Sequence, residues 1–383
     1  MGIYLDYNAS APIDNRVLEM MIDIYKNVYG NAESRTHVYG DNARKIVETA
    51  RFWVARLLGV ESSEVFFTSG STESNNLAIR GLIEYAEVSR KKHIITSTIE
   101  HKSILESVRS LKKMGFEIDL VDPEEDGRLN PQKVISLLRE DTLLVSLMHV
   151  NNETGIIQPI KEIGDVLYER GILFHVDATQ SCGKLVQELR NVKYNMLSLS
   201  AHKFSGPQGI GALILRRKQY KLPPVKAIFF GGKHENGIRP GTVPVALAAG
   251  LGKACELADM EYKENNMQLI KIKQIVIQLI GQSGLRYLFN GDQKFCMPNT
   301  INVSFLGVES EALMLSTKQF CGVSNGSACT SYEYNPSYVL MAMGLDTNRV
   351  SSAIRISWGV KTDREDLVSN LTSLMEVAKG LVV

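Results

Sequence analysis

Short apolar runs alternate with amphipathic helical stretches through the first two thirds of the chain. Between the runs, apolar residues recur at helical spacing, as at Val47, Ala50, Val54 and Leu58 before Gly59. The alternation predicts an α/β fold in which helices cover both faces of a mostly parallel sheet. Six runs have the length and composition of buried strands, at residues 65–67, 93–96, 143–147, 172–176, 196–199 and 212–215.

The pattern changes at about residue 262. A polar helical stretch over 261–282 leads to an apolar run over 300–305, and then to a loop rich in Ser and Gly around Cys329. A capping box over 362–365 predicts that a final helix begins there. We therefore expect a large domain over 15–260. A smaller α+β domain is expected from 1–14 and 261–383, with the cysteine loop at about 321–336.

Composition narrows the class of protein. Of 383 residues, 44% are hydrophobic and 22% charged, and the net charge is +1, which indicates neither a nucleic-acid groove nor a membrane surface. Five cysteines without a CxxC pair fit a reducing compartment, and no apolar run reaches the length of a membrane span. With no secretion signal at the start, we expect a cytoplasmic protein that binds no nucleic acid directly and no membrane. The seven histidines lack metal-ligand spacing, so no metal site is expected.

The first chemical signal is a lysine paired with an aspartate. Lys203 and Asp177 each follow a predicted strand, and ligands of parallel sheets bind at the carboxyl ends of the strands. A lysine amine can form a Schiff base with pyridoxal 5'-phosphate, while a carboxylate keeps the pyridine nitrogen protonated so that the ring accepts electrons. The alternative is that Lys203 is an ordinary paired lysine, so the rest of the site decides between the two.

A turn over residues 68–72 lies between a strand and a helix, where backbone N–H groups and hydroxyl side chains can hold a phosphate. Ser71 and Thr72 are the expected phosphate ligands. Ser200 and His202, beside the lysine, are further candidates. The alternative is an ordinary strand-to-helix turn in which Ser71 or Thr72 is the N-cap.

Three more polar residues follow strands. His101 is placed to stack on a pyridine ring and move protons, or is a loop histidine without a task. Asn152 is a candidate ligand of a substrate carboxylate or of the ring hydroxyl, although its surroundings also describe a simple turn. Gln180, three residues after Asp177, is a candidate for the same ring oxygen.

Cys329 and Arg355 complete the set. Four of the five cysteines are expected to be small buried hydrophobes, but Cys329 lies among Ser, Gly and Asn, which suits an exposed reactive thiol. Arg355 lies between apolar residues and is placed either to clamp an α-carboxylate or to form a structural ion pair.

Together these segments resemble the cysteine desulfurases of the NifS/IscS group, which are class V, fold-type I pyridoxal-phosphate enzymes. The resemblance covers nearly the whole chain. It is carried by residues 5–9, 29–31, 34–37, 67–76, 100–102, 149–153, 175–180, 200–203, 239–242 and 326–331. It implies a large domain with a mostly parallel seven-stranded sheet sandwiched by helices, plus a smaller α+β domain.

The resemblance also implies roles. Lys203 would hold the cofactor, Asp177 would pair with the pyridinium, Gln180 would contact the ring hydroxyl and His101 would stack on the ring. Residues implied to hold the phosphate are Ser71, Thr72, Ser200 and His202, with Thr242 supplied by the neighbouring subunit of a homodimer. Asn152 and Arg355 would hold the carboxylate of L-cysteine.

Cys329 would then attack the substrate sulfur, which gives L-alanine and a persulfide for a protein acceptor. The acceptor remains open between iron–sulfur scaffolds, tRNA thiolation enzymes and DNA phosphorothioation machinery. Departures from the family pattern at Asn325, Ser205 and Gln208 favour neither a general pathway nor a dedicated one, such as that of a DndA-like desulfurase. The alternatives to a desulfurase are another fold-type I enzyme, such as an aminotransferase or selenocysteine lyase, and a non-catalytic sulfur-relay or scaffold protein.

Overall fold

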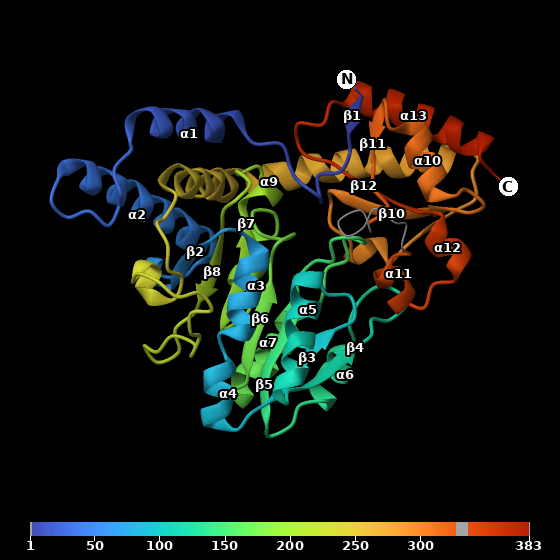
Figure 1. The fold of residues 1–383 in the computed structure, drawn as a ribbon. Helices are drawn as coiled ribbons and strands as arrows, with labels where there is room; N and C mark the ends of the chain where they lie inside the picture. The colour runs from blue at the N-terminus through green and yellow to red at the C-terminus, as the bar shows by residue number, and fades with distance from the viewer. Residues whose placement is uncertain (1, 327–335, 383) are drawn as a thin grey trace.

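The computed structural model describes residues 2–326 and 336–382. A seven-stranded sheet with the order β2-β8-β7-β6-β5-β3-β4 forms the centre of the molecule (Figure 1). Strand β8 is antiparallel to its neighbours β2 and β7, and the other adjacent pairs are parallel. The strands are β2 (Val65–Thr68), β3 (His93–Ser97), β4 (Glu117–Val121), β5 (Thr142–Met148), β6 (Leu173–Asp177), β7 (Met196–Ser200) and β8 (Gly211–Leu215). The predicted mostly parallel sheet is confirmed.

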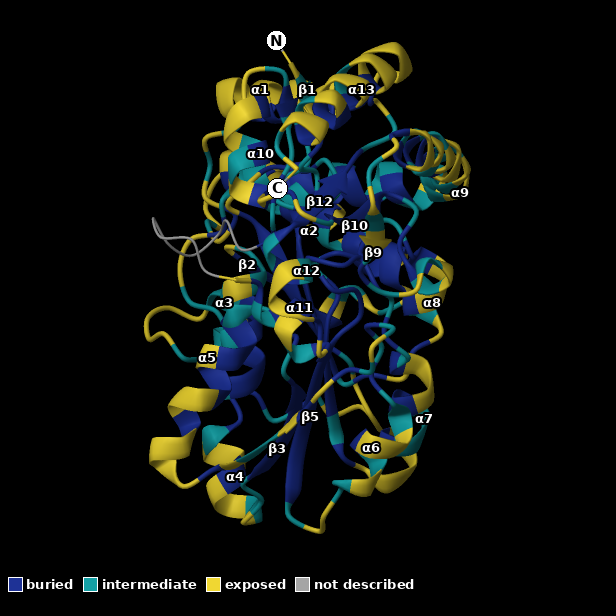
Figure 2. Ribbon diagram, turned by 90° about the vertical axis from the view of Figure 1, so that its right-hand side faces the viewer, coloured by how far each residue is buried: buried dark blue, intermediate teal, exposed yellow. Residues whose placement is uncertain are grey.

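Alternate residues of the strands pack against two different layers of helices. In β2, Val65 and Phe67 belong to one apolar cluster and Phe66 to the other. The first cluster includes side chains of α2 (Val38–Leu58), α6 (Pro131–Ser136), α7 (Ile160–Arg170), α8 (Val186–Arg190) and α9 (Val245–Gln282). The second includes α3 (Ser71–Arg80), α4 (Ile83–Ser89) and α5 (Lys102–Leu111). Figure 2 shows the strands buried between exposed helical surfaces.

Strand β4 is the strand of the central sheet that the hydrophobic pattern did not predict. It pairs only with β3, and most of its residues are exposed or partly exposed. Because an edge strand with this burial carries polar residues such as Glu117 and Asp119, it lacks the apolar run that marks a buried strand.

The C-terminal part forms a second core with its own small sheet, β12-β10-β9, which is antiparallel. The N-terminal strand β1 (Ile3–Tyr4) pairs with β11 (Cys321–Gly322) and brings Leu5 into the same apolar cluster as Phe305 and Trp358. The remaining elements are α1 (Asn15–Asn27), β9 (Tyr287–Phe289), β10 (Thr300–Phe305), α10 (Ser310–Thr317), α11 (Tyr338–Ala342), α12 (Thr347–Ser351), β12 (Ala353–Ser357) and α13 (Arg364–Gly380).

Two helix boundaries differ from the prediction. The helix expected from residue 261 begins at Val245, and it runs unbroken for 38 residues along both cores. The last helix has Asp363 as its N-cap, whose carboxylate accepts from Asp366 N. Thr362, the first residue of the expected capping box, instead accepts a hydrogen bond from Gly359 N. The division into domains at residue 260 stays a prediction, since α9 crosses it. Within the described residues, no helix has both the length and the apolar character that a bilayer crossing requires.

Close packing of α9 on α2 gives a prediction about stability. At Gly252, an added Cβ would lie 2.5 Å from Ala50 Cα, so the two helix backbones must move apart. We expect Gly252→Ala to lower the free energy of unfolding by about 2 kcal/mol or more. Urea unfolding measures the change.

Gly281→Ala is the matched control in the same helix. There the added Cβ would meet only Tyr287 Oη, at an ordinary 3.6 Å. Because alanine favours the helix over glycine by about 0.5–1 kcal/mol, this variant should be at least as stable as the parent. Equal effects of the two substitutions would contradict close packing at Gly252.

Candidate active site

A cavity of about 390 Å³ opens at the carboxyl ends of the central strands. Two predicted site residues are not among those that line this cavity. Thr242 does not line it, and Cys329 lies outside the described residues. The cavity gathers the other predicted residues, namely Ser71, Thr72, His101, Asn152, Asp177, Gln180, Ser200, His202, Lys203 and Arg355. The expected convergence of strand ends is therefore observed.

Asp177 ends strand β6, and only 4% of it is exposed. Its Oδ2 accepts from Asn75 Nδ2 at 2.9 Å, and its Oδ1 accepts from Thr179 N at 2.9 Å and from the Thr179 hydroxyl. A buried carboxylate needs such donors to remain charged. These contacts hold an anionic group with a fixed orientation at the floor of the cavity.

The same amide ties Asp177 to His101. Asn75 Nδ2 also donates to Ser103 Oγ at 2.9 Å, and Ser103 Oγ lies 2.8 Å from His101 Nδ1. Because Ser103 N donates to His101 Nδ1 at 3.1 Å, that nitrogen is an acceptor and the neutral ring carries its proton on Nε2. Burial, and then the nearby Lys203 and Lys102, lower the pKa of His101, although Asp177 opposes this shift. Sequence reasoning missed Asn75; the signal available was two polar residues, Ser74 and Asn75, on the buried face of a helix.

Lys203 ends a short 3₁₀ turn that follows β7. Its Nζ donates to the backbone oxygens of Asn8 and Ala9, each at 2.8 Å. Gln180 Nε2 donates to the same Asn8 oxygen at 2.9 Å, while Gln180 Oε1 is buried without a partner in the described structure. The N-terminal segment, which sequence reasoning left without a role, therefore holds the lysine and the glutamine together.

The turn before α3 has the form of an anion site. Gly70 is the N-cap, with φ 149° and ψ −178°, a conformation open almost only to glycine, so the alternative in which Ser71 or Thr72 is the N-cap is wrong. Because the first backbone N–H groups of a helix have no partner within it, those of Ser71 and Thr72 are available to a phosphate. His202 is beside this turn, and burial, helped by Lys203, lowers its pKa to about 4.

Arg355 enters the cavity from β12 and crosses between the two cores. Its Nη2 pairs with Asp6 at 2.6 Å and its Nη1 donates to Asn152 O at 2.7 Å, while Nε is buried without a partner in the described structure. The predicted structural ion pair is thus present. Asn152 Oδ1 is likewise buried and without a partner among the described residues. Next to the guanidinium, the cavity therefore has buried polar atoms that can form hydrogen bonds with a ligand.

Glu153, which sequence reasoning did not single out, joins the two ends of the segment that carries Cys329. Its buried carboxyl accepts from Ser337 Oγ. On the other side of the segment, a Cβ at Gly326 would lie 2.7 Å from Glu153 Oε2, so only glycine permits this approach. The segment therefore starts and ends at Glu153, which follows the cavity residue Asn152 in the chain.

The residues present fit pyridoxal phosphate. The cavity combines an amine, a buried carboxylate and a histidine with a helix N-terminus suited to a phosphate. Gln180 and Asn152 supply buried polar atoms that a polar ligand would satisfy. The fold and the site together define a pyridoxal-phosphate enzyme of fold type I.

Comparison with known proteins identifies the family within this class. Residues 3–369 match the family described as aminotransferase class-V. A cysteine desulfurase IscS of Anaeromyxobacter sp. (strain Fw109-5) is 45% identical over 382 residues, which cover 99% of this chain and 93% of that protein. A solved NifS-like protein has a TM-score of 0.91 at 35% identity and covers 100% of both chains. DndA from Streptomyces lividans has a TM-score of 0.81 at 38% identity over 92% of this chain and 98% of its own.

The chain belongs to the aminotransferase class-V family and, within it, to the cysteine desulfurases. Its cofactor is pyridoxal phosphate.

A buried acid next to His101 predicts a pH dependence of stability. Burial raises the pKa of Glu100 to about 8 in the folded protein, against 4.5 for an ordinary glutamate. Between these values the folded state keeps a proton that the unfolded state has released, so Glu100 makes stability fall as pH rises. Glu100→Gln should reduce this slope by up to about 1.4 kcal/mol per pH unit in urea unfolding.

The control is Glu106→Gln on helix α5, whose side chain is 64% exposed. That variant should retain the parental pH dependence. If Glu100→Gln also retains it, Glu100 is ionised in the folded protein.

Proposed function

We propose that this desulfurase removes sulfur from L-cysteine with Lys203, His101 and Cys329 as its catalytic residues. The observation that carries the proposal is the arrangement around one cavity of the Lys203 amine, the buried Asp177 carboxylate and the Arg355 guanidinium. The segment that bears Cys329 begins and ends at Glu153, the residue after Asn152, which lines the same cavity.

Cofactor binding is assigned to residues from five strand ends, those of β2, β3, β5, β6 and β7. Lys203 would attach to the aldehyde, Asp177 would pair with the pyridine nitrogen, and Gln180, with Asn152 nearby, would contact the ring hydroxyl. His101 would stack on the ring. The phosphate would be held by Ser71, Thr72, Ser200 and His202. When bound, the cofactor supplies an electron-accepting ring that stabilises negative charge at the substrate α-carbon.

The substrate would be oriented through its carboxylate. Arg355 has a buried Nε–H donor without a partner in the described structure. The unpartnered atom of Asn152 is the acceptor Oδ1, which suits an N–H or O–H group of the ligand. A carboxylate placed there would receive charge-assisted hydrogen bonds from a guanidinium that Asp6 already orients.

Proton movement at the substrate is assigned mainly to Lys203. His101 Nδ1 already accepts from Ser103, and its lowered pKa keeps the ring neutral, so His101 has only the Nε2 proton to offer. The Lys203 amine, once it is no longer attached to the cofactor, has a lone pair that can take the α-proton. Cys329 would then attack the substrate sulfur as a thiolate, forming an S–S bond while the C–S bond breaks, with L-alanine as the other product.

Replacement of Cys329 separates sulfur transfer from cofactor binding. Cys329→Ala should lower sulfide release from L-cysteine by at least about a hundredfold, because no thiol can accept the sulfur. The visible absorption of the bound cofactor should remain, and borohydride reduction should leave a pyridoxyl group on Lys203, detected by mass spectrometry.

Cys321→Ala, at a buried cysteine close in sequence, is the control and should retain activity. Desulfuration that survives Cys329→Ala would disprove the assigned nucleophile. A reduced protein without an adduct on Lys203 would disprove the cofactor attachment.

We also propose a homodimer in which Thr242 contributes to the phosphate site of the neighbouring subunit. Thr242 is exposed and belongs to a segment that two ion pairs fix to helices α2 and α3 and one hydrogen bond fixes to β2. Glu235 pairs with Arg51 at 2.7 Å and accepts from Phe67 N at 2.8 Å, and Arg239 pairs with Glu73 at 2.7 Å.

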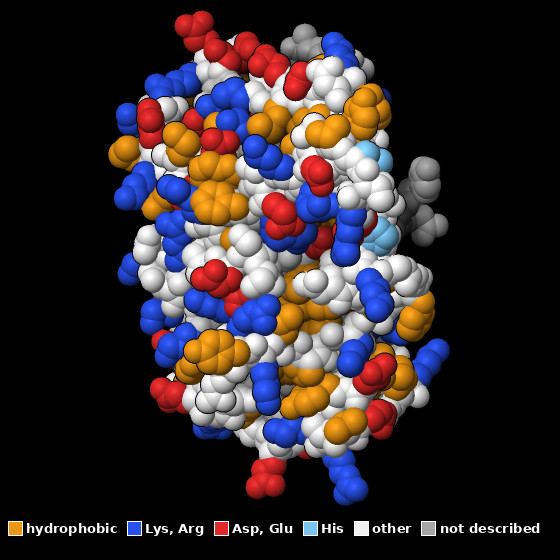
Figure 3. Space-filling model, turned by 90° about the vertical axis from the view of Figure 1, so that its left-hand side faces the viewer, with side chains coloured by type: hydrophobic (Ala, Val, Ile, Leu, Met, Phe, Trp, Pro, Cys, Tyr) orange, Lys and Arg blue, Asp and Glu red, His pale blue; other side chains and the backbone are white. Residues whose placement is uncertain are grey.

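The face around this segment has the character of an interface. Figure 3 shows apolar side chains spread among basic ones on the side of the molecule where α1 and α2 lie. The exposed large apolar residues of these elements and of the nearby segment are Leu18, Met20, Ile22, Tyr25, Tyr29, Val38, Tyr39, Phe52, Phe229 and Phe230. Aromatic residues of this kind are enriched at interfaces.

Mixed dimers test whether Thr242 acts across subunits. Thr242→Ala and Lys203→Ala chains should each be strongly impaired alone. Co-expressed with different tags, they should form a dimer with one complete site, because the Lys203→Ala chain supplies Thr242 to its partner. Activity of the purified mixed dimer should approach half that of the parent. A mixed dimer no better than Thr242→Ala alone, or a monomer by light scattering, would contradict the proposal.

The sulfur acceptor is proposed to be a separate protein. Support comes from the position of the ends of the Cys329-bearing segment beside a wide cavity of about 740 Å³, lined by Lys102, Arg109, Gly326, Pro336 and Tyr338.

A further inference from the structure

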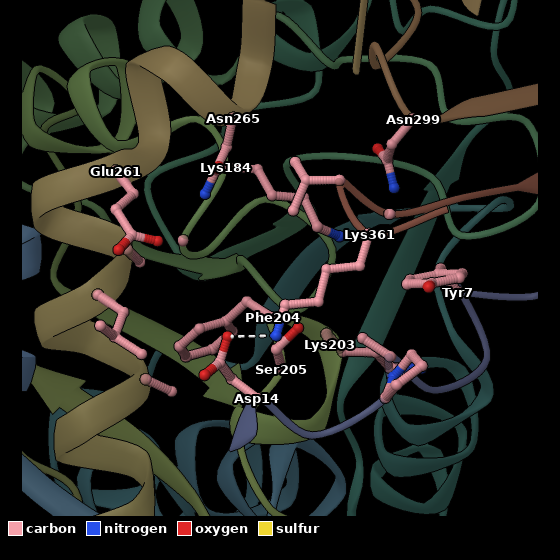
Figure 4. A pocket seen from close by; sticks show the side chains of 18 of the residues that line it. Tyr7, Asp14, Lys184, Lys203, Phe204, Ser205, Glu261, Asn265, Asn299 and Lys361 are labelled. Atoms are coloured by element: carbon pink, nitrogen blue, oxygen red, sulfur yellow. Dashed lines mark hydrogen bonds and ion pairs between the residues drawn. The ribbon is translucent and has the colours of Figure 1, made fainter. Parts of the chain in front are cut away.

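A second cavity, of about 190 Å³, lies next to the active site. Of the residues that line it, only Lys203 also lines the cofactor cavity. Its walls come from the N-terminal segment around Asp14, from helix α9 around Glu261, and from the turn over 358–361 that follows β12. Figure 4 shows Lys184, Asn299 and Lys361 reaching into this space from different segments. No role in desulfuration accounts for it.

The charges around this second cavity are unbalanced. Its lining includes the cations Arg16, Lys184, Lys203 and Lys361 and the carboxylates Asp14 and Glu261. Arg16 pairs with Asp14 at 3.0 Å and with Glu261 at 2.6 Å, and Lys361 pairs with Asp14 at 2.9 Å. Both carboxylates are therefore engaged at the cavity mouth, where Arg16 and Lys361 are exposed.

Lys184 takes no part in these ion pairs. Its Nζ donates to Gln180 O at 3.1 Å, and in the described ranges no carboxylate oxygen lies within 4.0 Å of it. A partly buried ammonium without an acidic partner favours an anion from outside.

Two buried polar atoms elsewhere in the cavity wall also lack partners. Trp358 is 0% exposed and Asn299 is 2% exposed, and both line the cavity. Trp358 Nε1 and Asn299 Oδ1 have no hydrogen-bond partner in the part of the chain that the structure describes. Their positions are coupled, because Trp358 N donates to Asn299 O at 3.1 Å. Buried N–H groups are rarely left unsatisfied, so this wall also indicates a ligand.

We propose that the second cavity binds a short-chain carboxylate, with its charge toward Lys184 and its carbon chain against the apolar wall. The wall that would hold the chain consists of Ile13, Val17, Phe204, Leu257 and Leu269. The volume equals that of about six waters, which is enough for an acid of a few carbons. An inorganic anion would leave the apolar wall without a contact.

Burial, and then the charge of Lys203, lower the pKa of Lys184 to about 7. Asp14, Arg16, Glu261 and Lys361 also face the cavity, but they are held in the ion pairs described above. Carboxylate binding should therefore weaken as the pH rises through 7, as the Lys184 ammonium loses its proton.

Titration of the holoenzyme with propionate, followed by calorimetry, tests the proposal. Lys184→Met and Trp358→Phe should each weaken propionate binding about tenfold or more, since each removes one donor and keeps most of the side-chain volume. Lys263→Met, an equal loss of charge at an exposed position of α9 outside the cavity, should leave the affinity unchanged. Propionamide, of the same shape without the charge, should bind at least tenfold more weakly than propionate.

Arg355→Met separates this site from the substrate pocket. Propionate binding that persists in Arg355→Met and is lost in Lys184→Met supports the second site. Binding lost in Arg355→Met and unchanged in Lys184→Met, or no binding to the parent enzyme, overturns the proposal. Cofactor absorbance and urea midpoints verify that each variant is folded, and if Lys184→Met fails this check, Trp358→Phe decides. Desulfurase activity of the parent is unaffected by any of these outcomes, so failure here leaves the proposed function intact.

Discussion

Asp177 holds a negative charge at the end of a central strand, almost completely removed from water. Such a charge is costly unless donors surround it, and Asn75 and Thr179 provide them. A cationic pyridine nitrogen above the carboxylate would add the missing counter-charge. The buried position of Asp177 follows from β6 lying between β5 and β7, so the site depends on the order of strands in the sheet.

The hydrogen bonds of Asn75 extend this constraint to the rest of the cavity. One amide orients both the carboxylate of Asp177 and, through Ser103, the ring of His101. Carboxylate and ring therefore cannot move independently. On the other side, Arg355 and Asp6 bring the small sheet and the N-terminal segment to the same cavity. The proposed substrate site thus lies where the two cores meet.

Much of the fold could be predicted because buried parallel strands have a strong signature. Six central strands appear as apolar runs, and Gly59 ends α2 in the left-handed conformation that glycine favours. The edge strand β4 was not predicted because most of its side chains face water. The first half of α9 was not predicted because its small residues are buried on several sides, so the stretch over 245–260 lacks an amphipathic pattern.

For the site, the sequence by itself determined which chemistry is available: Lys203, Asp177, His101 and the turn at Ser71 follow strand ends, and strand ends converge in any parallel sheet. It also determined the family, through motifs that cover most of the chain. Only the tertiary structure decided which polar groups meet across long sequence distances. No local signal predicts the contact of Asn8 with Lys203 or that of Asp6 with Arg355, because both depend on how the two cores pack. The same holds for the cavity that Lys184 and Trp358 both line.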